Sequence, residues 1–429
     1  MTIMESNVKF SSGLYSSENG QKKKVMVLGA SYLQSFIIRK IQEMGHEAIA
    51  LDGNPDCDAR GLADRFYHCN TTDKEGVLKI AKEEEIDAIL TYASDVAAPT
   101  VSYVAEELGL PCNPLDAVNI MTDKTLTRQF MIAHGFNVPK YKEVLNLEEA
   151  YAAIREIGIP VIVKPVDGSG SRGVSKIESP NNAPSLHKEE SLATAFNFAR
   201  DNSKSKRVII EEFIVKKGYQ VDADCFMYDG KLTFFHAMDQ HQDPIAPYSP
   251  IGISAPSVES KEKTEIAHQE VQRFLSLLGM RFGEYNVEYV FDNDNRLYII
   301  EIGPRSGGNL IPDVILESSG LDLRELSIRA SLGEDCSHFP YDDYTFKKNV
   351  TSFIIHSQES GIYQGLDIDE EIEKTIIFKD MFVAAGDDIH RFTGGIYALG
   401  FALMQFDKQE QMLEFIDHSA KYFRIKVTN

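Results

Sequence analysis

The chain has 429 residues, which exceeds the size of one ordinary hydrophobic core and predicts several domains. Its formal net charge of −21 opposes non-specific attraction to nucleic acid or to an anionic membrane surface. Small molecules are therefore the expected partners, with no nucleic acid and no membrane. The five cysteines are scattered without a CxxC pair or zinc spacing, and no apolar run approaches a membrane span. These features favour a globular protein of the reduced cytoplasm.

The N-terminal part predicts a tail followed by an open parallel sheet. Residues 1–21 are polar and are expected to form a mobile tail. From residue 22 a buried strand, an amphipathic helix and a second strand form a βαβ unit, and helix–strand alternation continues to about residue 115. Ser31 and Gln34 stand where a GxGxxG fingerprint requires glycine. A structural or substrate-facing α/β domain is therefore favoured over NAD binding.

Further along the chain, a helix over residues 122–136 begins at a capping Thr or Asp and stops at Gly135. An alternating stretch that breaks at Asp229 and Gly230 predicts a hairpin, with which antiparallel sheet begins. Residues 335–429 mix short strands with one helix. This order predicts an α+β region after the parallel sheet.

Two glutamates on a second hairpin are the first candidate site. With the turn at residues 292–295, Glu288 is expected opposite Ile299, and Glu301 on the same face, diagonal to Glu288 and roughly 7 Å away at Cβ. At an effective dielectric near 20, charges about 5 Å apart repel by roughly 3 kcal/mol, so the pair needs a cation, a shared proton or full solvation. Their hard oxygens suit Mg²⁺. A solvated hairpin face with unrelated glutamates is the alternative.

The glycine-rich stretch DGSGSRG, residues 167–173, is the second candidate. Glycines let consecutive backbone N–H groups close around phosphate oxygens, and Ser169 and Ser171 add hydroxyl donors. It is not a P-loop, because no GKS or GKT closes it, and an ordinary flexible turn is the alternative. Lys164 precedes it within apolar IPVIVKP, where a buried ammonium needs either a phosphate or a structural salt bridge.

Two further segments are candidates. The acidic strand end EEFI, residues 211–214, can offer backbone groups to an adenine edge while a nearby side chain takes the ribose hydroxyls. Arg305, four residues after Glu301, can neutralise charge on a transferred phosphoryl group. A plain surface arginine is the alternative for Arg305.

In this order, over residues 22–429, these elements resemble the ATP-grasp superfamily, which includes D-alanine-D-alanine ligase, biotin carboxylase and the large chain of carbamoyl phosphate synthetase. The likeness is closest to L-amino acid ligases and more distant to biotin carboxylase and carboxyaminoimidazole ribonucleotide synthetase. It implies an N-terminal open parallel α/β (pre-ATP-grasp) domain at 22–115 and a C-terminal α+β module at 335–429. Between them it implies an ATP-grasp core of two α+β subdomains at 116–334, with a lid at about 155–214.

The resemblance also implies roles for single residues, with ATP and Mg²⁺, or Mn²⁺, as cofactors. Arg305 and Lys164 are the implied catalytic residues, and Glu288 and Glu301 the implied metal ligands. The implied ATP-binding residues are Lys124, Lys164, Gly168, Ser169, Gly170, Ser171, Gly173, Val174, Glu211, Glu212, Phe213, Ile214 and Gln220.

The sequence departs from the family pattern at two positions. Gln220 stands where many members carry a ribose-binding Glu, so it can hydrogen-bond but lacks charge. Where many members read ExNxR, this chain has Gly303 between Glu301 and Arg305, so the usual third metal ligand is missing and Asn309 is the expected substitute.

The function implied is a carboxylate-amine ligase: ATP phosphorylates a carboxylate, an amine attacks the acyl phosphate, and ADP and phosphate leave. Amino acids are the expected substrates, bound near His236, His241 and the PIGISAPS stretch, although both histidines fit ordinary strand positions as well. A homodimer is compatible with this assignment. A bicarbonate-dependent carboxylase of the purine or biotin type, and a nucleotide-binding protein without catalysis, are the alternatives.

Overall fold

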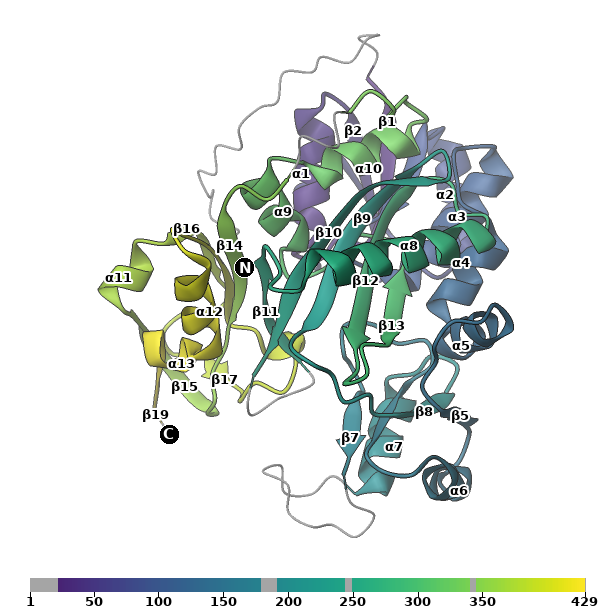
Figure 1. The fold of residues 1–429 in the computed structure, drawn as a ribbon. Helices are drawn as coiled ribbons and strands as arrows, with labels where there is room; N and C mark the ends of the chain where they lie inside the picture. Colours follow the sequence, from purple (N-terminus) through teal and green to yellow (C-terminus); the bar gives the residue numbers. More distant parts are fainter. Residues whose placement is uncertain (1–21, 179–190, 244–248, 340–344, 429) are drawn as a thin grey trace.

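The structure is a computed structural model that describes residues 22–178, 191–243, 249–339 and 345–428. The predicted tail, residues 1–21, lies outside this part of the chain. The described strands form four sheets, and Figure 1 shows the N-terminal sheet, a small lobe carrying α6 and α7, and the C-terminal strands around one large central sheet. No helix of the described residues combines the length and the apolar character that crossing a bilayer requires.

The N-terminal sheet is parallel throughout, in the order β3-β2-β1-β4, which confirms the predicted open α/β arrangement. Strands β1, β2 and β4 contain buried apolar runs, as strands covered on both faces require, whereas the edge strand β3 is exposed or half-buried. The elements are β1 (Lys24–Leu28), α1 (Gln34–Glu43), β2 (Glu47–Asp52), β3 (Arg65–His68), α2 (Lys74–Glu84), β4 (Ala88–Thr91) and α3 (Ala98–Leu108).

The first turn of this sheet is closed by Gln34, the first residue of α1. Its side chain accepts a hydrogen bond from the backbone N–H of Ser31 at 3.0 Å and donates one to the carbonyl of Tyr92 after β4. A glutamine at a fingerprint glycine position is thus part of the turn's own hydrogen bonding and joins two strand ends.

The lobe at the lower right of Figure 1 is an antiparallel sheet in the order β5-β8-β6-β7, with helices α6 and α7 packed on it through one apolar cluster. Because β5 begins at Tyr141, the sheet starts ahead of residue 155, where the lid was expected to begin. The elements from α4 onward are α4 (Leu115–Thr122), α5 (Lys124–Ala133), β5 (Tyr141–Val144), α6 (Leu147–Ile157), β6 (Val161–Pro165), β7 (Ser175–Ile177), α7 (Leu192–Asp201) and β8 (Val208–Glu212).

The central sheet runs in the order β13-β12-β9-β10-β11-β14-β18-β16. Three strands after residue 335, namely β14, β16 and β18, therefore continue the sheet of the core, and the domain limits stay predictions. The elements are β9 (Gln220–Tyr228), β10 (Lys231–Gln242), β11 (Pro250–Ala255), α8 (Lys261–Leu277), β12 (Gly283–Phe291), β13 (Leu297–Gly303), α9 (Ile311–Ser319), α10 (Leu323–Ser331), β14 (Asn349–Ile355), β16 (Ile376–Met381) and β18 (Gly400–Phe406).

A smaller sheet in the order β17-β15-β19 completes the C-terminal part. Helix α12 covers β14 and β18, and its Phe415 packs against Phe353 and Phe406. The elements are β15 (Gly361–Ile368), α11 (Glu370–Glu373), β17 (Asp388–Ile389), α12 (Gln409–Asp417), α13 (Ser419–Tyr422) and β19 (Phe423–Thr428).

The two faces of the central sheet differ in chemistry. On β9, Ala223 and Cys225 belong to the apolar cluster that includes residues of α8. Because side chains alternate along a strand, Asp222 and Asp224 point to the opposite face. Polar residues of β9, β12 and β13 are thus gathered on one side of the sheet.

The predicted register of the second hairpin is wrong. The ladder pairs Phe291 with Leu297, so the turn is one residue longer than expected, and a bulge follows Glu288. Glu288 consequently stands directly opposite Glu301, not opposite Ile299. The two carboxylates share a face as predicted, but as a direct cross-strand pair.

Candidate active site

The predicted site residues converge on one cavity of about 600 Å³ between the β5–β8 lobe, the polar face of the central sheet and the loops after β1 and β4. Gly173 is the exception. A Cβ there would lie 2.9 Å from Asn202 and Pro165, so Gly173 packs the loop against α7. The predicted residues that line the cavity are Lys124, Lys164, Gly168, Ser169, Gly170, Ser171, Val174, Glu211, Glu212, Phe213, Ile214, Gln220, Glu288, Glu301, Arg305 and Asn309.

Lys124 connects the glycine-rich loop with the hairpin. Asp123 caps helix α5 by accepting a hydrogen bond from Leu126, which places Lys124 at the first helical position. Its Nζ lies 3.0 Å from Glu301 Oε1 and donates to the carbonyl of Gly168 at 2.6 Å. Burial opposes ionisation of Glu301, but the charges of Lys124 and Lys164 outweigh it and hold the pKa of Glu301 below its ordinary value.

Glu288 is in the opposite electrostatic situation. Burial and the neighbouring charges of Asp222 and Glu301 raise the pKa of Glu288 to about 8. Gln220 donates a hydrogen bond from Nε2 to Glu288 Oε2 at 2.6 Å, so one of its amide N–H groups is used within the site. Without a cation, Glu288 therefore retains a proton near neutral pH while Glu301 is ionised.

Lys164 and Glu211 form a buried cluster with Arg128. Lys164 Nζ lies 2.6 Å from Glu211 Oε2, and Arg128 Nε lies 2.7 Å from Glu211 Oε1. These two cations lower the pKa of Glu211 to about 2 despite its burial. Arg128 also donates to the carbonyl of Ile300 at 2.7 Å and so ties the lobe to β13. The salt bridge anticipated as one alternative for Lys164 is present, with Glu211 as its partner.

Sequence reasoning missed Arg128, although a signal existed. Arg128 is 1% exposed and lies four residues after Lys124, on the buried face of the same predicted helix. A cation in a buried helical position requires an acidic partner. That requirement would have identified Arg128 as part of the site.

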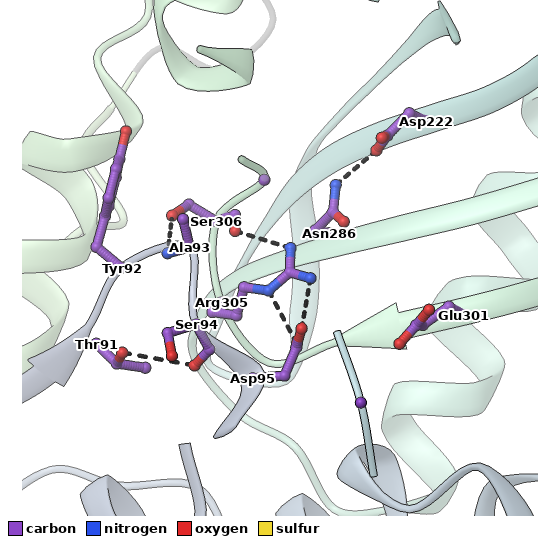
Figure 2. A network of polar contacts seen from close by, with 12 residues as sticks. Thr91, Tyr92, Ala93, Ser94, Asp95, Asp222, Asn286, Glu301, Arg305 and Ser306 are labelled. Atoms are coloured by element: carbon purple, nitrogen blue, oxygen red, sulfur yellow. Dashed lines mark hydrogen bonds and ion pairs between the residues drawn. The ribbon is translucent and has the colours of Figure 1, made fainter. Parts of the chain in front are cut away.

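Arg305 is held by Asp95, which follows β4 in the N-terminal sheet. The guanidinium makes two parallel bonds to this carboxylate, Nε to Oδ1 at 2.8 Å and Nη2 to Oδ2 at 2.7 Å, as Figure 2 shows. A third bond runs from Nη1 to the carbonyl of Ser306 at 2.9 Å. Among the described residues these bonds use three of the five N–H donors of Arg305, so two donors are available at the cavity.

The Asp95–Arg305 pair gives a physical reason for Gly303. A Cβ at Gly303 would lie 2.3 Å from Asp95 Oδ1 and 3.2 Å from Arg305 Cζ. The place of the usual third ligand is thus filled by this ion pair. Asn309 lines the same cavity, in a left-handed conformation with φ of 52°.

A row of buried polar groups extends from Glu288 along β9 and β12. Asn286 Nδ2 donates to Asp222 Oδ1 at 2.5 Å and to Asp224 Oδ1 at 2.8 Å, and the first of these bonds is drawn in Figure 2. Burial and the charge of Asp224 raise the pKa of Asp222 to about 7, and burial raises the pKa of Asp224 to about 6. This face of the sheet carries more carboxylates than its own cations balance.

A divalent cation fits this arrangement. No group of three or more His, Cys, Asp or Glu side chains within the described ranges is placed to hold a metal on its own. Mg²⁺, however, is commonly bound by one or two carboxylates together with substrate phosphates and water. Glu288 and Glu301 provide two carboxylates on one face, and burial together with the charges of Asp222 and Glu301 disfavours the ionised form of Glu288, which a bound cation would stabilise.

The two histidines do not take part in this cavity. His241 bonds through Nε2 to Ser254 Oγ at 2.8 Å, and alternation along β10 turns its neighbours Gln240 and Gln242 toward the cavity instead. The ring of His236 stacks on Phe346, with centroids 4.1 Å apart. The structure therefore does not support a substrate role for either histidine.

The comparisons with known proteins agree with this geometry. The ATP-grasp domain family matches residues 157–313. Over 326 residues the chain is 26% identical to formate-dependent phosphoribosylglycinamide formyltransferase from Syntrophotalea carbinolica, covering 72% of this chain and 75% of that one. Its fold is similar over 95% of the chain to L-amino acid ligase from Bacillus licheniformis (TM-score 0.77, 20% identical, 99% of that chain). It is also similar over 95% to phosphoribosylglycinamide synthetase from Anaerococcus prevotii (TM-score 0.72, 21% identical, 100% of that chain). The chain thus carries an ATP-grasp domain and is an ATP-grasp enzyme of the ADP-forming ligase type, for which ATP and Mg²⁺ are the typical cofactors.

Proposed function

We propose that this protein is a carboxylate-amine ligase that works through an acyl phosphate. A carboxylate oxygen attacks the γ-phosphorus of ATP, the bond to the β–γ bridging oxygen breaks, and ADP leaves. An amine nitrogen then attacks the acyl carbon, the bond to the phosphate oxygen breaks, and the nitrogen loses a proton. One observation carries the proposal: the glycine-rich loop, the paired glutamates and the anchored Arg305 face a single cavity.

The cations of the cavity are assigned to the phosphates of ATP. Lys124 lies between the loop carbonyl of Gly168 and the carboxylate of Glu301, so a phosphate group there replaces contacts it already makes. Lys164 is kept in place by Glu211, and burial together with the charge of Arg128 lowers its pKa. Glu211 holds the ammonium of Lys164 in the cavity wall, so the ammonium is pre-organised to contact phosphate oxygens.

Glu288 and Glu301 are assigned as magnesium ligands, with Asn309 as a further oxygen donor. Bound magnesium would supply positive charge that offsets the charge of the phosphates. The residues of this chain then set the position of the metal. Gln220 fixes one oxygen of Glu288, and Lys124 leaves the second oxygen of Glu301 available.

Arg305 is assigned to the transferred phosphoryl group and to the acyl phosphate. Its bidentate bonds to Asp95 fix the plane of the guanidinium, and its two remaining N–H donors are suited to phosphate or carboxylate oxygens. Asp95 acts here as a positioning residue, because it holds Arg305 and is not itself assigned to substrate.

The segment at residues 211–214 is assigned to the adenine. The N–H groups of Glu212 and Phe213 are bonded to the carbonyls of Lys140 and Pro160. Among the described residues, the N–H of Ile214 has no protein acceptor and remains for an adenine edge. The ring of Phe213 is covered by the ammonium of Lys176 at 3.9 Å from its centroid, which makes one wall of this end.

The experiment is a screen for Mg²⁺-dependent ADP release over pairs of carboxylates and amines, followed by mass detection of the product. Release that requires both an acid and an amine, and yields an amide, supports the ligase. Release that depends on bicarbonate without an amino acid would select the carboxylase alternative. ATP binding with no release for any pair would select the alternative without catalysis.

A further inference from the structure

Beyond Arg305 the cavity ends in an apolar wall that two distant parts of the chain build together. Tyr32 and Leu33 come from the turn before α1. The other apolar residues of this wall come from the segments around β16 and β18. We call Tyr32, Phe382 and Phe401 the aromatic wall. The apolar residues at this end are Tyr32, Leu33, Phe382, Ile396, Ala398 and Phe401.

The aromatic wall is a packed unit. The rings of Tyr32 and Phe382 meet edge to face with centroids 4.7 Å apart, and Tyr32 stacks on Phe401 at 5.9 Å. Phe382 and Phe401 are themselves 5.6 Å apart. Each ring is thereby fixed by two others, so the wall offers a preformed apolar surface.

This surface begins beside the candidate catalytic arginine. Leu33 Cδ1 lies 3.8 Å from the position that a Cβ at Gly308 would take, and Gly308 is three residues after Arg305. Ala93 and Asp95, from the loop that holds Arg305, line the same cavity. A carboxylate bound at Arg305 therefore has its own side group within reach of the wall.

Ile396 marks the open edge of this surface. It lies in the short turn Gly395–Tyr397, is 65% exposed, and still lines the cavity. An apolar side chain exposed at the mouth of a site gains free energy when a ligand covers it with apolar surface. Ile396 thus favours an apolar ligand group at this end.

The charges of this end disfavour a phosphorylated ligand group. The cations that line the cavity on the described residues are Lys124, Lys164, Arg172, Lys176, Lys216 and Arg305. Five of them lie on α5, on the β5–β8 lobe or just after it, and Arg305 is already paired with Asp95. Within the described residues, the N-terminal segments contribute Asp58 and Asp95 to the cavity, and the C-terminal segments contribute no charged side chain. A phosphate dianion would meet carboxylates and apolar groups here, which disfavours it.

We propose that the aromatic wall binds the side group of the carboxylate substrate, and that this acid is unphosphorylated and carries an aromatic or branched aliphatic group. The inference rests on the proposed ligase function. It distinguishes the chain from an enzyme that activates formate or bicarbonate, because those acids have no group that reaches the wall.

The first test compares acids that carry one carboxylate and side groups of different size under saturating ATP and Mg²⁺, with ammonium and a panel of amino acids as amines. The acids are formate, acetate, isovalerate, phenylacetate, L-leucine and L-phenylalanine. kcat/KM for ADP release is expected to rise at least about tenfold from acetate to the isovalerate or phenylacetate type of acid. Equal or higher values with formate, acetate or bicarbonate, or with a phosphorylated substrate, would overturn the inference and leave the ligase intact. If none of the acids supports ADP release, the proposed function is overturned instead.

The second test changes the wall without disturbing the ATP end. Ile396→Asp alters an exposed side chain, so folding should be retained. KM for the apolar acid is expected to rise at least about tenfold, while KM for ATP stays unchanged. Ile132→Asp is the matched control, since Ile132 is 58% exposed on α5 and does not line the cavity. An unchanged KM in Ile396→Asp, or an equal rise in the control, would contradict the proposal.

Discussion

The two ends of the cavity are built on different principles. The end at the hairpin is charged and cross-linked, with Lys164 and Arg128 bonded to the buried Glu211 and Lys124 bonded to the half-buried Glu301. The other end is apolar and is formed by aromatic rings. The residues matched to the ATP-grasp domain, 157–313, supply much of the first end, whereas the aromatic wall lies outside them. Under the proposed function, nucleotide chemistry and substrate choice are assigned to different segments, so likeness in the first does not determine the second.

The largest expected effect is on stability, at the charged end. Arg128→Met removes one partner of a buried cluster and leaves Glu211 with Lys164 alone, so the free energy of unfolding should fall by about 3–5 kcal/mol. Urea unfolding monitored by circular dichroism measures this. The double variant Arg128→Met with Glu211→Gln should lose further stability, because it leaves the ammonium of Lys164 buried without its acidic partner. A single-variant loss below about 1 kcal/mol would show that the cluster does not join the lobe to β13.

Replacing a proposed metal ligand should affect catalysis more than folding. Glu301→Gln is expected to lower kcat for Mg²⁺-dependent ADP release by about 10²–10³-fold, because it removes charge from the metal and a partner from Lys124. The control is Glu373→Gln at an exposed position of α11, which should retain full activity. Unchanged turnover in Glu301→Gln would contradict the assignment of Glu301 as a magnesium ligand.

A smaller effect is expected where the two ends meet. Gly303→Asn restores the residue type that the family pattern has, but its Cβ would lie too close to Asp95. We expect kcat to fall by about tenfold through displacement of the Asp95–Arg305 pair. A steady-state assay over ATP and acid concentrations measures it. If Gly303→Asn were more active than the wild type, the site could accommodate a third metal ligand at residue 303, and this account of Gly303 would be wrong.

The smallest effect is a pH dependence of stability without nucleotide and metal. The pKa of Glu288 is raised from 4.5 to about 8, so the folded state binds a proton that the unfolded state has lost. This contribution is fully present below about pH 4.5 and is lost as pH rises to about 8, with a slope of at most about 1.4 kcal/mol per pH unit. Protonated Glu288 stabilises the wild type, so the urea midpoint of the wild type should fall with rising pH in this window. Glu288→Gln lacks this titration, and the two midpoints should therefore converge. Parallel midpoints would contradict the assignment.

Much of the fold could be predicted from the sequence, because it depends on local patterns. Apolar runs and helical periodicity identified the parallel sheet, and alternation placed Glu288 and Glu301 on one face. The register failed because a bulge after Glu288 and a turn longer by one residue leave no periodic signal. A shift of this kind depends on the neighbouring strands rather than on the hairpin itself.

The partners of the site residues were less predictable than the residues themselves. Asp95 and Arg305 are separated by 210 positions, and Arg128 and Glu211 by 83, so neither pairing has a local signature. The aromatic wall likewise joins Tyr32 to Phe382 and Phe401 across most of the chain. Local motifs therefore indicated the charged end of the cavity, whereas the apolar end results from tertiary packing.

Formation of an acyl phosphate transfers one oxygen atom from the acid to phosphate, and this transfer can be measured directly. The protein is incubated with ATP, Mg²⁺, an amine and an apolar carboxylic acid labelled with ¹⁸O in its carboxylate, and the released phosphate is analysed by mass spectrometry. Activation as an acyl phosphate predicts one ¹⁸O atom in each phosphate released with the amide. Unlabelled phosphate accompanying amide formation would contradict the account.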